Sequence, residues 1–451
     1  MYRKNDDKLD HWLKKKGRKP LLLRGARQVG KSTIVRQFAA RNNLDLIEIN
    51  LERQPQMDEV FGSLDVKRIL HAIESLPKSG KVSGNSVLFL DEIQATPNAL
   101  AALRYFYEEW PDLPVIAAGS LLEFVLNDHK FSMPVGRIEY LHMHPMSFEE
   151  FLIARDAKKL VLAIETMIST QKVEPFVHQQ ICDHLKYFLF VGGMPEAIKV
   201  FIETDSLRDV SDVHSSILDT YKDDFAKYAK KQDLLLLHRA LAYGARAVGE
   251  RVKYVEISRD EPSRTLKYIL DLLCYAKLMD RVYHSDANAV PLGVDINDKV
   301  FKLLFLDVGL MNASNKLDWR SISDASDLTA INSGKVSEQF VGQELRREHD
   351  LFFWVRDGKG GNAEVDYVVN SAQQIIPIEV KSGKSGRLRS LLSFAQRGQP
   401  KLLLRFDTNL PSLQKITLDE SPSQRKGRRP EVDLLSLPLY AAGFFSRSIS
   451  G

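Results

Sequence analysis

The sequence predicts an α/β protein built from several domains, and three observations lead to this fold class. The chain has 451 residues, more than one hydrophobic core usually serves. An apolar strand, a glycine-rich loop and an amphipathic helix follow one another between residues 21 and 38. Short hydrophobic strands after residue 300 carry charged residues inside them. We expect four segments, residues 1–155, 156–235, 236–298 and 299–451.

Composition predicts a globular protein of the reducing cytoplasm. Hydrophobic residues make up 44% of the chain and charged residues 27%, as in ordinary soluble proteins. The only cysteines, Cys182 and Cys274, lack the spacing of a zinc site or a disulfide framework. The charged N-terminus, "MYRKNDDKLDHWLKKKGRK", is not typical of a signal peptide. No apolar run approaches the roughly 18 residues of a membrane-spanning helix, so we expect no membrane partner.

The charge balance leaves the choice of partner open. The net charge of +4 arises from 63 basic and 59 acidic residues, and this small excess does not by itself indicate nucleic-acid binding. Two basic clusters, at residues 14–19 and 425–429, are either solvated surface or contacts for a phosphate backbone.

The most specific motif is a phosphate-binding loop between a strand and a helix. Residues 25–32, "GARQVGKS", fit the G-x-x-x-x-G-K-[ST] pattern of a P-loop (Walker A). Gly25 and Gly30 let backbone N–H groups point at phosphate oxygens, and the helix N-terminus adds positive potential. Lys31 is expected to reach the outer phosphates and Ser32 to ligate magnesium. The predicted nucleotide-binding residues of this loop are Gly25, Ala26, Arg27, Gln28, Val29, Gly30, Lys31, Ser32 and Thr33.

Acidic and polar residues follow two further apolar strands. The run Val87–Leu90 is unbroken, as in a central parallel strand. Asp91 ends this run and is expected to hold Mg²⁺ through water, while Glu92 is placed to polarise the attacking water. The next strand ends at Gly119 and Ser120, where the Ser120 hydroxyl would lie beside the γ-phosphate. Together with the P-loop, these residues predict a nucleoside-triphosphate hydrolase.

Arg137 lies in a Gly-Arg pair between two apolar stretches. A lone arginine is usually a surface charge, and the alternative is an arginine finger or a phosphate sensor. The segments "GARQVGKST", "LFLDEIQ", "AAGSLLEF", "GRIEYLHMHPMSFEEF" and "FLFVGGMPEAI" resemble AAA-type P-loop ATPases of a small prokaryotic family, often fused to an uncharacterised C-terminal domain. The resemblance implies ATP, which the P-loop alone does not distinguish from GTP. It also implies that Ser120 is a sensor and that Arg137 senses nucleotide or completes the site.

The middle of the chain is predicted to be helical. Residues 191–198, "VGGMPEAI", read as a tight junction between two helices, with a lid over the nucleotide as the alternative. Residues 254–286 then show the helix, turn, helix and strand order of a winged helix-turn-helix. Arg259, Arg264 and Lys267 would face DNA phosphates, although winged helices also serve as protein–protein modules.

The C-terminal part carries charged residues in strand positions, in "AEVDYVVNSAQQIIPIEVKSG" (residues 363–383). Glu379 and Lys381 are two apart on one expected strand, so they face the same side, and a hairpin would bring Asp366 beside them. Glu338 lies near the start of a preceding helix. Glu338, Asp366 and Glu379 would hold Mg²⁺ for hydrolysis of a phosphodiester by water. Lys381 would stabilise the developing charge or lower the pKa of that water.

The order helix Glu, strand Asp and strand Glu-x-Lys resembles the PD-(D/E)XK restriction-endonuclease-like superfamily. This resemblance implies a nuclease-like α/β domain, in which Glu364 would support Asp366 from the same face. One alternative is a surface hairpin with an ordinary Glu/Lys pair. The other is a nuclease fold that has lost catalysis and binds nucleic acid or a partner protein.

These motifs favour an ATP- and Mg²⁺-binding enzyme whose nucleotide state gates a nuclease-like domain, with DNA or another nucleic acid and further copies of the chain as candidate partners. The alternative is a signalling or scaffold ATPase with an inactive nuclease fold. A helicase or an AAA unfoldase is a weaker alternative, because the chain has no second P-loop and no evident aromatic pore loop.

Overall fold

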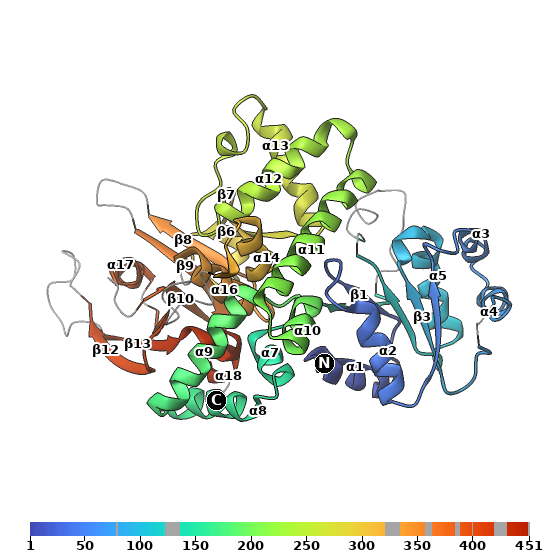
Figure 1. Ribbon diagram of the computed structural model, residues 1–451, viewed down its shortest axis with the longest axis horizontal. Helices are drawn as coiled ribbons and strands as arrows, with labels where there is room; N and C mark the ends of the chain where they lie inside the picture. The colour runs from blue at the N-terminus through green and yellow to red at the C-terminus, as the bar shows by residue number, and fades with distance from the viewer. Residues whose placement is uncertain are drawn as a thin grey trace. The chain divides into compact units, whose positions relative to one another are not determined.

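The computed structural model describes residues 1–77, 80–120, 122, 136–320, 334–356, 363–383, 388–398, 400–418 and 431–449. The chain divides into two compact units: the first comprises Met1–Pro145 with Tyr275–Leu278, and the second comprises Met146–Cys274 with Met279–Gly451. The boundary expected at residue 155 therefore falls inside the second unit. That unit is not divided further at residues 235 or 298, where the sequence predicted boundaries. In Figure 1 the first unit runs from blue to cyan and the second from green to red.

The first unit is a parallel sheet with helices. Its strands have the order β2-β3-β4-β1-β5, and all neighbouring strands are parallel. The strands are β1 (Leu21–Arg24), β2 (Asp45–Asn50), β3 (Ser86–Asp91), β4 (Val115–Ala118) and β5 (Glu139–His142). The helical elements are α1 (Asn5–Lys14), α2 (Lys31–Arg41), α3 (Met57–Gly62), α4 (Val66–Glu74), η1 (Ile93–Ala95) and α5 (Pro97–Glu109).

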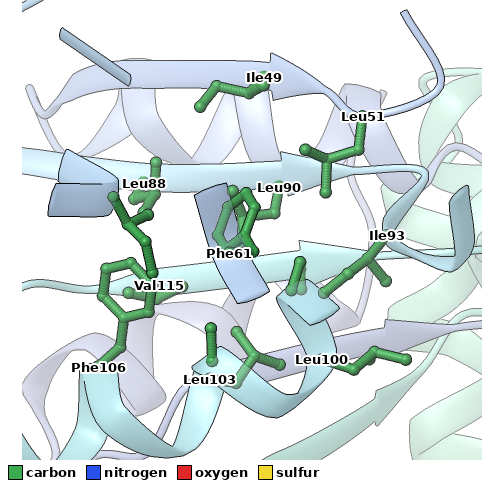
Figure 2. Packing of buried hydrophobic residues seen from close by; sticks show 14 of the residues in the cluster. Ile49, Leu51, Phe61, Leu88, Leu90, Ile93, Leu100, Leu103, Phe106 and Val115 are labelled. Atoms are coloured by element: carbon green, nitrogen blue, oxygen red, sulfur yellow. The ribbon is translucent and has the colours of Figure 1, made fainter. Parts of the chain in front are cut away.

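The apolar periodicity of this region builds the core as expected. Ile34, Val35 and Phe38 of α2 are all buried, and every residue of β3 is buried. Figure 2 shows Phe61 of α3 and Phe106 of α5 among the residues that pack with the strands. Each such side chain stabilises the fold by about 1.5–3 kcal/mol relative to an exposed one. This packing fixes the strand ends on which the first site is built.

The second unit begins with helices, as the sequence predicted. These are α7 (Phe148–Ala154), α8 (Lys158–Thr170), α9 (Pro175–Val191), α10 (Pro195–Thr204), α11 (Leu207–Tyr228), η2 (Lys231–Asp233) and α12 (Leu234–Arg246). Gly192 ends α9 with φ +69°, and α10 begins three residues later at Pro195. The expected helix–helix junction is therefore present at "VGGMP".

The helical turn, helix and strand expected at residues 254–286 are present, but the strands join a larger sheet, so the winged helix stays a prediction. The elements are η3 (Tyr254–Glu256), α13 (Ser263–Tyr275), β6 (Met279–Ser285), η4 (Leu292–Asp295) and β7 (Ile296–Phe305). Leu266, Ile269, Leu270 and Leu273 of α13 are buried. Strand β6 pairs antiparallel with β7 and parallel with β8 (Phe352–Arg356). The boundary expected after residue 298 thus falls within β7.

The remaining elements complete an eight-stranded mixed sheet of order β12-β13-β11-β10-β9-β8-β6-β7. They are α14 (Val308–Ser314), α16 (Gly334–Leu345), β9 (Ala363–Ser371), β10 (Gln374–Val380), α17 (Arg389–Gly398), β11 (Leu402–Asp407), β12 (Ser412–Thr417), β13 (Glu431–Pro438), η6 (Leu439–Phe444) and α18 (Phe445–Ile449). In Figure 1, β8, β9 and β10 lie side by side, as their pairing requires.

Two helices cover different faces of this sheet. Phe394 of α17 packs on Trp354 and belongs to the same cluster as Val365. The side chain of Glu364 points instead towards the α16 residue Glu338, because both carboxylates contact Lys302. Among the described residues, no helix is both long and apolar enough to cross a membrane.

Candidate functional site

The P-loop lies at the carboxyl edge of the first sheet, between β1 and α2. Gly25 and Gly30 have φ angles of +146° and +93°, which residues with a side chain rarely adopt. A Cβ on Gly25 would also overlap the backbone carbonyl oxygen of Met143, just after β5. Only glycine therefore allows the loop to turn so close to the neighbouring strand.

Lys31 lies folded against the beginning of the loop. Its ammonium donates hydrogen bonds to the carbonyl oxygens of Gly25 at 3.0 Å and Ala26 at 2.7 Å. Burial lowers the pKa of Lys31 to about 8, although Glu92 and Asp91 oppose this shift. A phosphate oxygen would be a stronger partner for this ammonium than two neutral carbonyl groups.

Ser32, at the start of α2, contacts Asp91, at the end of β3. The Ser32 hydroxyl donates to Asp91 Oδ2 at 2.8 Å, so two oxygen ligands of the kind that Mg²⁺ prefers lie together. Burial raises the pKa of Asp91, while the bond from Ser32 opposes this effect. The sequence placed both residues at a magnesium site, and this donor pair fits a magnesium ion.

Glu92 is held in an unusual backbone conformation. Its φ and ψ are +52° and +46°, a left-handed geometry that costs a non-glycine residue about 1–2 kcal/mol. Its Oε2 accepts hydrogen bonds from Gln94 Nε2 at 2.5 Å and from the Ser120 hydroxyl at 3.4 Å. Glu92 and Ser120, both predicted site residues, are thus brought together at the carboxyl edge of the sheet.

Sequence reasoning missed two residues of this site. Gln94 orients the Glu92 carboxylate, and its place in "LFLDEIQ" was the available signal. Buried Arg3 donates to the carbonyl oxygens of Val29, at 2.8 Å, and His144, at 2.6 Å. Arg3 thereby ties the P-loop to the segment after β5, although no local pattern marks it.

Arg137 is not brought to the P-loop of its own subunit. It precedes β5, which is parallel to β1, so it lies at the opposite edge of the sheet from the P-loop. Its guanidinium pairs with Glu108 at 3.0 Å, near the end of α5. A role for Arg137 as a sensor within its own subunit does not agree with this position. A role as a finger in a neighbouring copy stays a prediction.

The second predicted site forms where β9 and β10 separate. The antiparallel register pairs Tyr367 with Ile378, and one step further along it sets Asp366 opposite Glu379. Asp366 Oδ2 accepts a hydrogen bond from the Val380 backbone N–H at 2.7 Å. Lys381 forms an ion pair with Glu379 Oε1. The hairpin that the sequence predicted therefore brings these three charged residues together.

Glu338 is engaged by a residue that the sequence did not single out. Lys302 of β7, whose side chain is only 3% exposed, lies 3.0 Å from Glu338 Oε1 and 2.7 Å from Glu364 Oε1. In sequence Lys302 stands inside the apolar run of a strand, so its partners could not be recognised. Burial opposes its charge, but Glu338, Asp366 and Glu364 raise the pKa of Lys302 above its ordinary value.

The acidic cluster is defined here as Glu338, Glu364, Asp366 and Glu379. Its four carboxylates outnumber the cations that the described part of the chain places beside it. These are Lys302, Lys381 and Arg251, the last at 3.7 Å from Glu364. Burial raises the pKa values of Glu338 and Glu379 to about 7. The surroundings of these two carboxylates in the folded chain therefore disfavour their negative charge.

The surroundings of Glu379 Oε2 indicate whether the acidic cluster could hold a divalent cation. Glu379 Oε2 is buried and accepts no hydrogen bond from the residues that the structure describes. An orphaned carboxylate oxygen beside Asp366 suits a hard cation. However, the described part of the chain contains no three His, Cys, Asp or Glu side chains arranged as a metal shell. The pair Asp366 and Glu379 thus fits a metal ion, whereas Glu338 is turned to Lys302.

The predicted DNA-contacting residues are accessible. Arg259, Arg264 and Lys267 are all exposed, next to and on helix α13. Their helix buries its apolar side, so the basic side chains project from the opposite side.

Family comparisons cover most of the chain in three parts. Residues 17–152 match a family model described as an AAA domain. Residues 182–321 and 333–416 match two domains of unknown function, DUF8612 and DUF4143. The latter two descriptions name no activity.

A curated relative and two solved structures are similar to this chain. The uncharacterized protein MJ1637 of Methanocaldococcus jannaschii is 25% identical over 291 residues, which span 61% of this chain and 59% of that protein. The Walker-type ATPase PABY2304 of Pyrococcus abyssi has a TM-score of 0.44 and 15% identity, over 69% of this chain and 95% of that one. The ORC2 protein of Aeropyrum pernix has a TM-score of 0.35 and 12% identity, over 70% and 94%.

The AAA family match and the geometry of the first site coincide. The matched residues contain the P-loop, Asp91, Glu92 and Ser120, which the parallel sheet gathers at one edge. Residues 17–152 therefore match an AAA domain and carry the geometry of a P-loop at the carboxyl edge of a parallel sheet.

Proposed function

We propose that this protein is an ATPase whose nucleotide state controls a Mg²⁺-dependent phosphodiester-hydrolysing site in its second unit. The observation that carries the second half is the buried Glu379 Oε2 beside Asp366 and Lys381, which has no hydrogen-bond partner among the described residues. These are the residue types that metal-assisted hydrolysis of a phosphodiester requires. The resemblance of their order to PD-(D/E)XK nucleases supports the same reading.

At the first site, the loop amides and Lys31 bind the triphosphate. Ser32 and Asp91 would hold Mg²⁺, which when bound neutralises charge that develops on the phosphates. Glu92 accepts hydrogen bonds from Gln94 and Ser120, and it orients the attacking water as a general base. The Ser120 hydroxyl, which shares a hydrogen bond with Glu92, would contact the γ-phosphate. Binding of this phosphate would thereby affect the position of the Glu92 carboxylate.

At the second site, Asp366 and Glu379 would hold one divalent cation, which supplies Lewis-acid activation of water and of the phosphate. Lys381 is 28% exposed, so its ammonium can approach a phosphate oxygen and stabilise the negative charge of the transition state. Asp366 is positioned by the Val380 amide; burial raises the pKa of Asp366, and this hydrogen bond opposes the shift.

Nucleic acid is the proposed substrate class, and DNA is the first candidate. Exposed Arg259, Arg264 and Lys267 would contact its phosphates through the winged-helix elements. We also propose that copies of the chain associate, so that Arg137 completes a neighbour's nucleotide site.

Incubation of full-length protein with supercoiled plasmid and short duplexes, with Mg²⁺ or Mn²⁺ and with or without ATP, tests the proposal. We expect metal-dependent cleavage that Asp366→Ala abolishes and that Lys31→Ala uncouples from ATP. ATP binding, measured by calorimetry, should be lost in Lys31→Ala and retained in Asp366→Ala. Absence of cleavage under all conditions, with Asp366→Ala binding DNA like the wild type, would remove the nuclease half.

One observation favours the second candidate function, a scaffold ATPase with an inactive nuclease fold. Lys302 already forms ion pairs with Glu338 and Glu364, as in a structural ion-pair network. The scaffold hypothesis predicts ATP turnover and binding of a partner protein without DNA affinity. A DNA interaction that weakens steeply with salt would argue against it.

A further inference from the structure

The acidic cluster contains its own cation. Lys302 Nζ lies between the carboxylates of Glu338 and Glu364, at 3.0 and 2.7 Å. The Lys302 side chain is only 3% exposed, and it approaches the ring of Phe353, whose centroid is 5.2 Å away. An ammonium held on several sides in this way is a fixed part of the site.

Glu338 is itself fixed in this arrangement. Its Oε2 lies where a Cβ on Gly249 would collide with it, and its backbone carbonyl accepts a hydrogen bond from the Tyr367 hydroxyl at 2.9 Å. The Tyr367 hydroxyl therefore fixes the α16 backbone at Glu338, while Lys302 and Gly249 confine the Glu338 side chain. Glu338 cannot turn to a metal between Asp366 and Glu379 without giving up its ion pair with Lys302.

The other half of the cluster is different. Glu379 is 4% exposed, and its Oε2 has no hydrogen-bond partner among the described residues. Its Oε1 pairs with Lys381, which is more exposed than Lys302. The unsatisfied carboxylate oxygen of the cluster is therefore that of Glu379, beside Asp366, and it points to one cation.

We propose that Lys302 is a positioning residue that occupies the place of a second metal ion, so that the acidic cluster binds a single divalent cation through Asp366 and Glu379 and not through Glu338. This inference rests on the proposed metal-dependent function and adds to it the number of ions and the exclusion of Glu338. Lys302 lies on β7, so its ammonium is supplied by the antiparallel pair β6 and β7.

Binding of Mn²⁺ to the nucleotide-free, full-length chain tests this inference. Asp91→Asn in every protein removes the metal ligand of the first site. Calorimetry and electron paramagnetic resonance should then give one bound ion. We expect Glu379→Gln to weaken Mn²⁺ binding at least tenfold and Glu338→Gln to leave it within about twofold.

Lys302→Met should increase the number of bound ions from one to two, because it leaves Glu338 and Glu364 without their cation. If this variant does not fold, Lys302→Met/Glu338→Gln is the matched control, since it removes one charge of each sign. It should bind one ion with the affinity of the parent.

The outcomes separate this inference from the proposed function. A tenfold loss in Glu338→Gln, or a folded Lys302→Met that still binds one ion, overturns the role of Lys302 even if the protein cleaves DNA. One ion bound with the expected variant pattern, but without cleavage, refutes the nuclease and supports the inference. Absence of Mn²⁺ binding in the parent overturns both.

Discussion

Replacement of Asp307 by alanine should destabilise the second unit strongly. Asp307 is fully buried at the turn between β7 and α14. Its carboxylate accepts hydrogen bonds from the backbone N–H groups of Gly193 at 2.6 Å, Gly309 at 3.0 Å and Leu310 at 3.2 Å. It thus caps α14 and also binds the glycine junction after α9. A Cβ on Gly192 would overlap this carboxylate, which explains why glycine is needed there.

The expected cost follows from these three bonds. A buried donor that loses its partner costs about 1–3 kcal/mol, and loss of a helix N-cap costs about 0.5–2 kcal/mol. Because some relaxation and water entry occur, we expect a total of about 3–5 kcal/mol, as for the loss of other buried networks. This is a large fraction of the roughly 5–15 kcal/mol that holds a typical domain folded.

Urea unfolding followed by circular dichroism measures this cost. Asp307→Asn keeps one acceptor oxygen and should lose less stability than Asp307→Ala. Asp298→Ala, at an exposed position on the preceding strand β7, is the matched control and should change stability by under about 0.5 kcal/mol. A loss below about 1 kcal/mol in Asp307→Ala would refute the reasoning.

Four further predictions concern the two sites. Glu92→Gln should retain ATP binding while turnover falls about 10²–10⁴-fold; unchanged turnover would exclude a general base here. Gly25→Ala should weaken ATP binding measured by calorimetry, because its Cβ overlaps the Met143 carbonyl, and normal affinity would contradict this packing. Arg137→Ala should lower turnover only at concentrations where copies associate, without loss of ATP affinity; an equal loss at all concentrations would argue against a neighbour's site. Raised pKa values near 7 at Glu338 and Glu379 favour the folded state fully below about pH 4.5, and this stability is lost as pH rises towards 7. The melting temperature should therefore fall between pH 5 and pH 8, less so in Glu379→Gln, and an equal fall in both proteins would refute the assignment.

The sequence by itself predicted most of the residues that the structure gathers at the P-loop, although not Gln94 or Arg3. Residues 25–33 are contiguous, and their chemistry depends on the backbone of one loop and the first turn of one helix. Asp91 and Ser120 could be placed because Asp91 ends one buried strand and Ser120 lies two residues after another, and parallel strands end at the same edge of a sheet. The hairpin with Asp366 and Glu379 was equally accessible, since the spacing along two adjacent strands defines which side chains face each other.

Only the tertiary structure decided which cation each carboxylate contacts. Lys302 lies in an apolar strand, whose pattern predicts a core position. Its ion pair with Glu338 joins residues far apart in the sequence. Arg137 is the opposite case, because its Gly-Arg pair predicted a role at the nucleotide site, yet the direction of β5 places it away from the P-loop. Local patterns record the chemistry of adjacent residues. The partner of a buried charge, by contrast, depends on strand order and helix packing, which the pattern of a single segment does not contain.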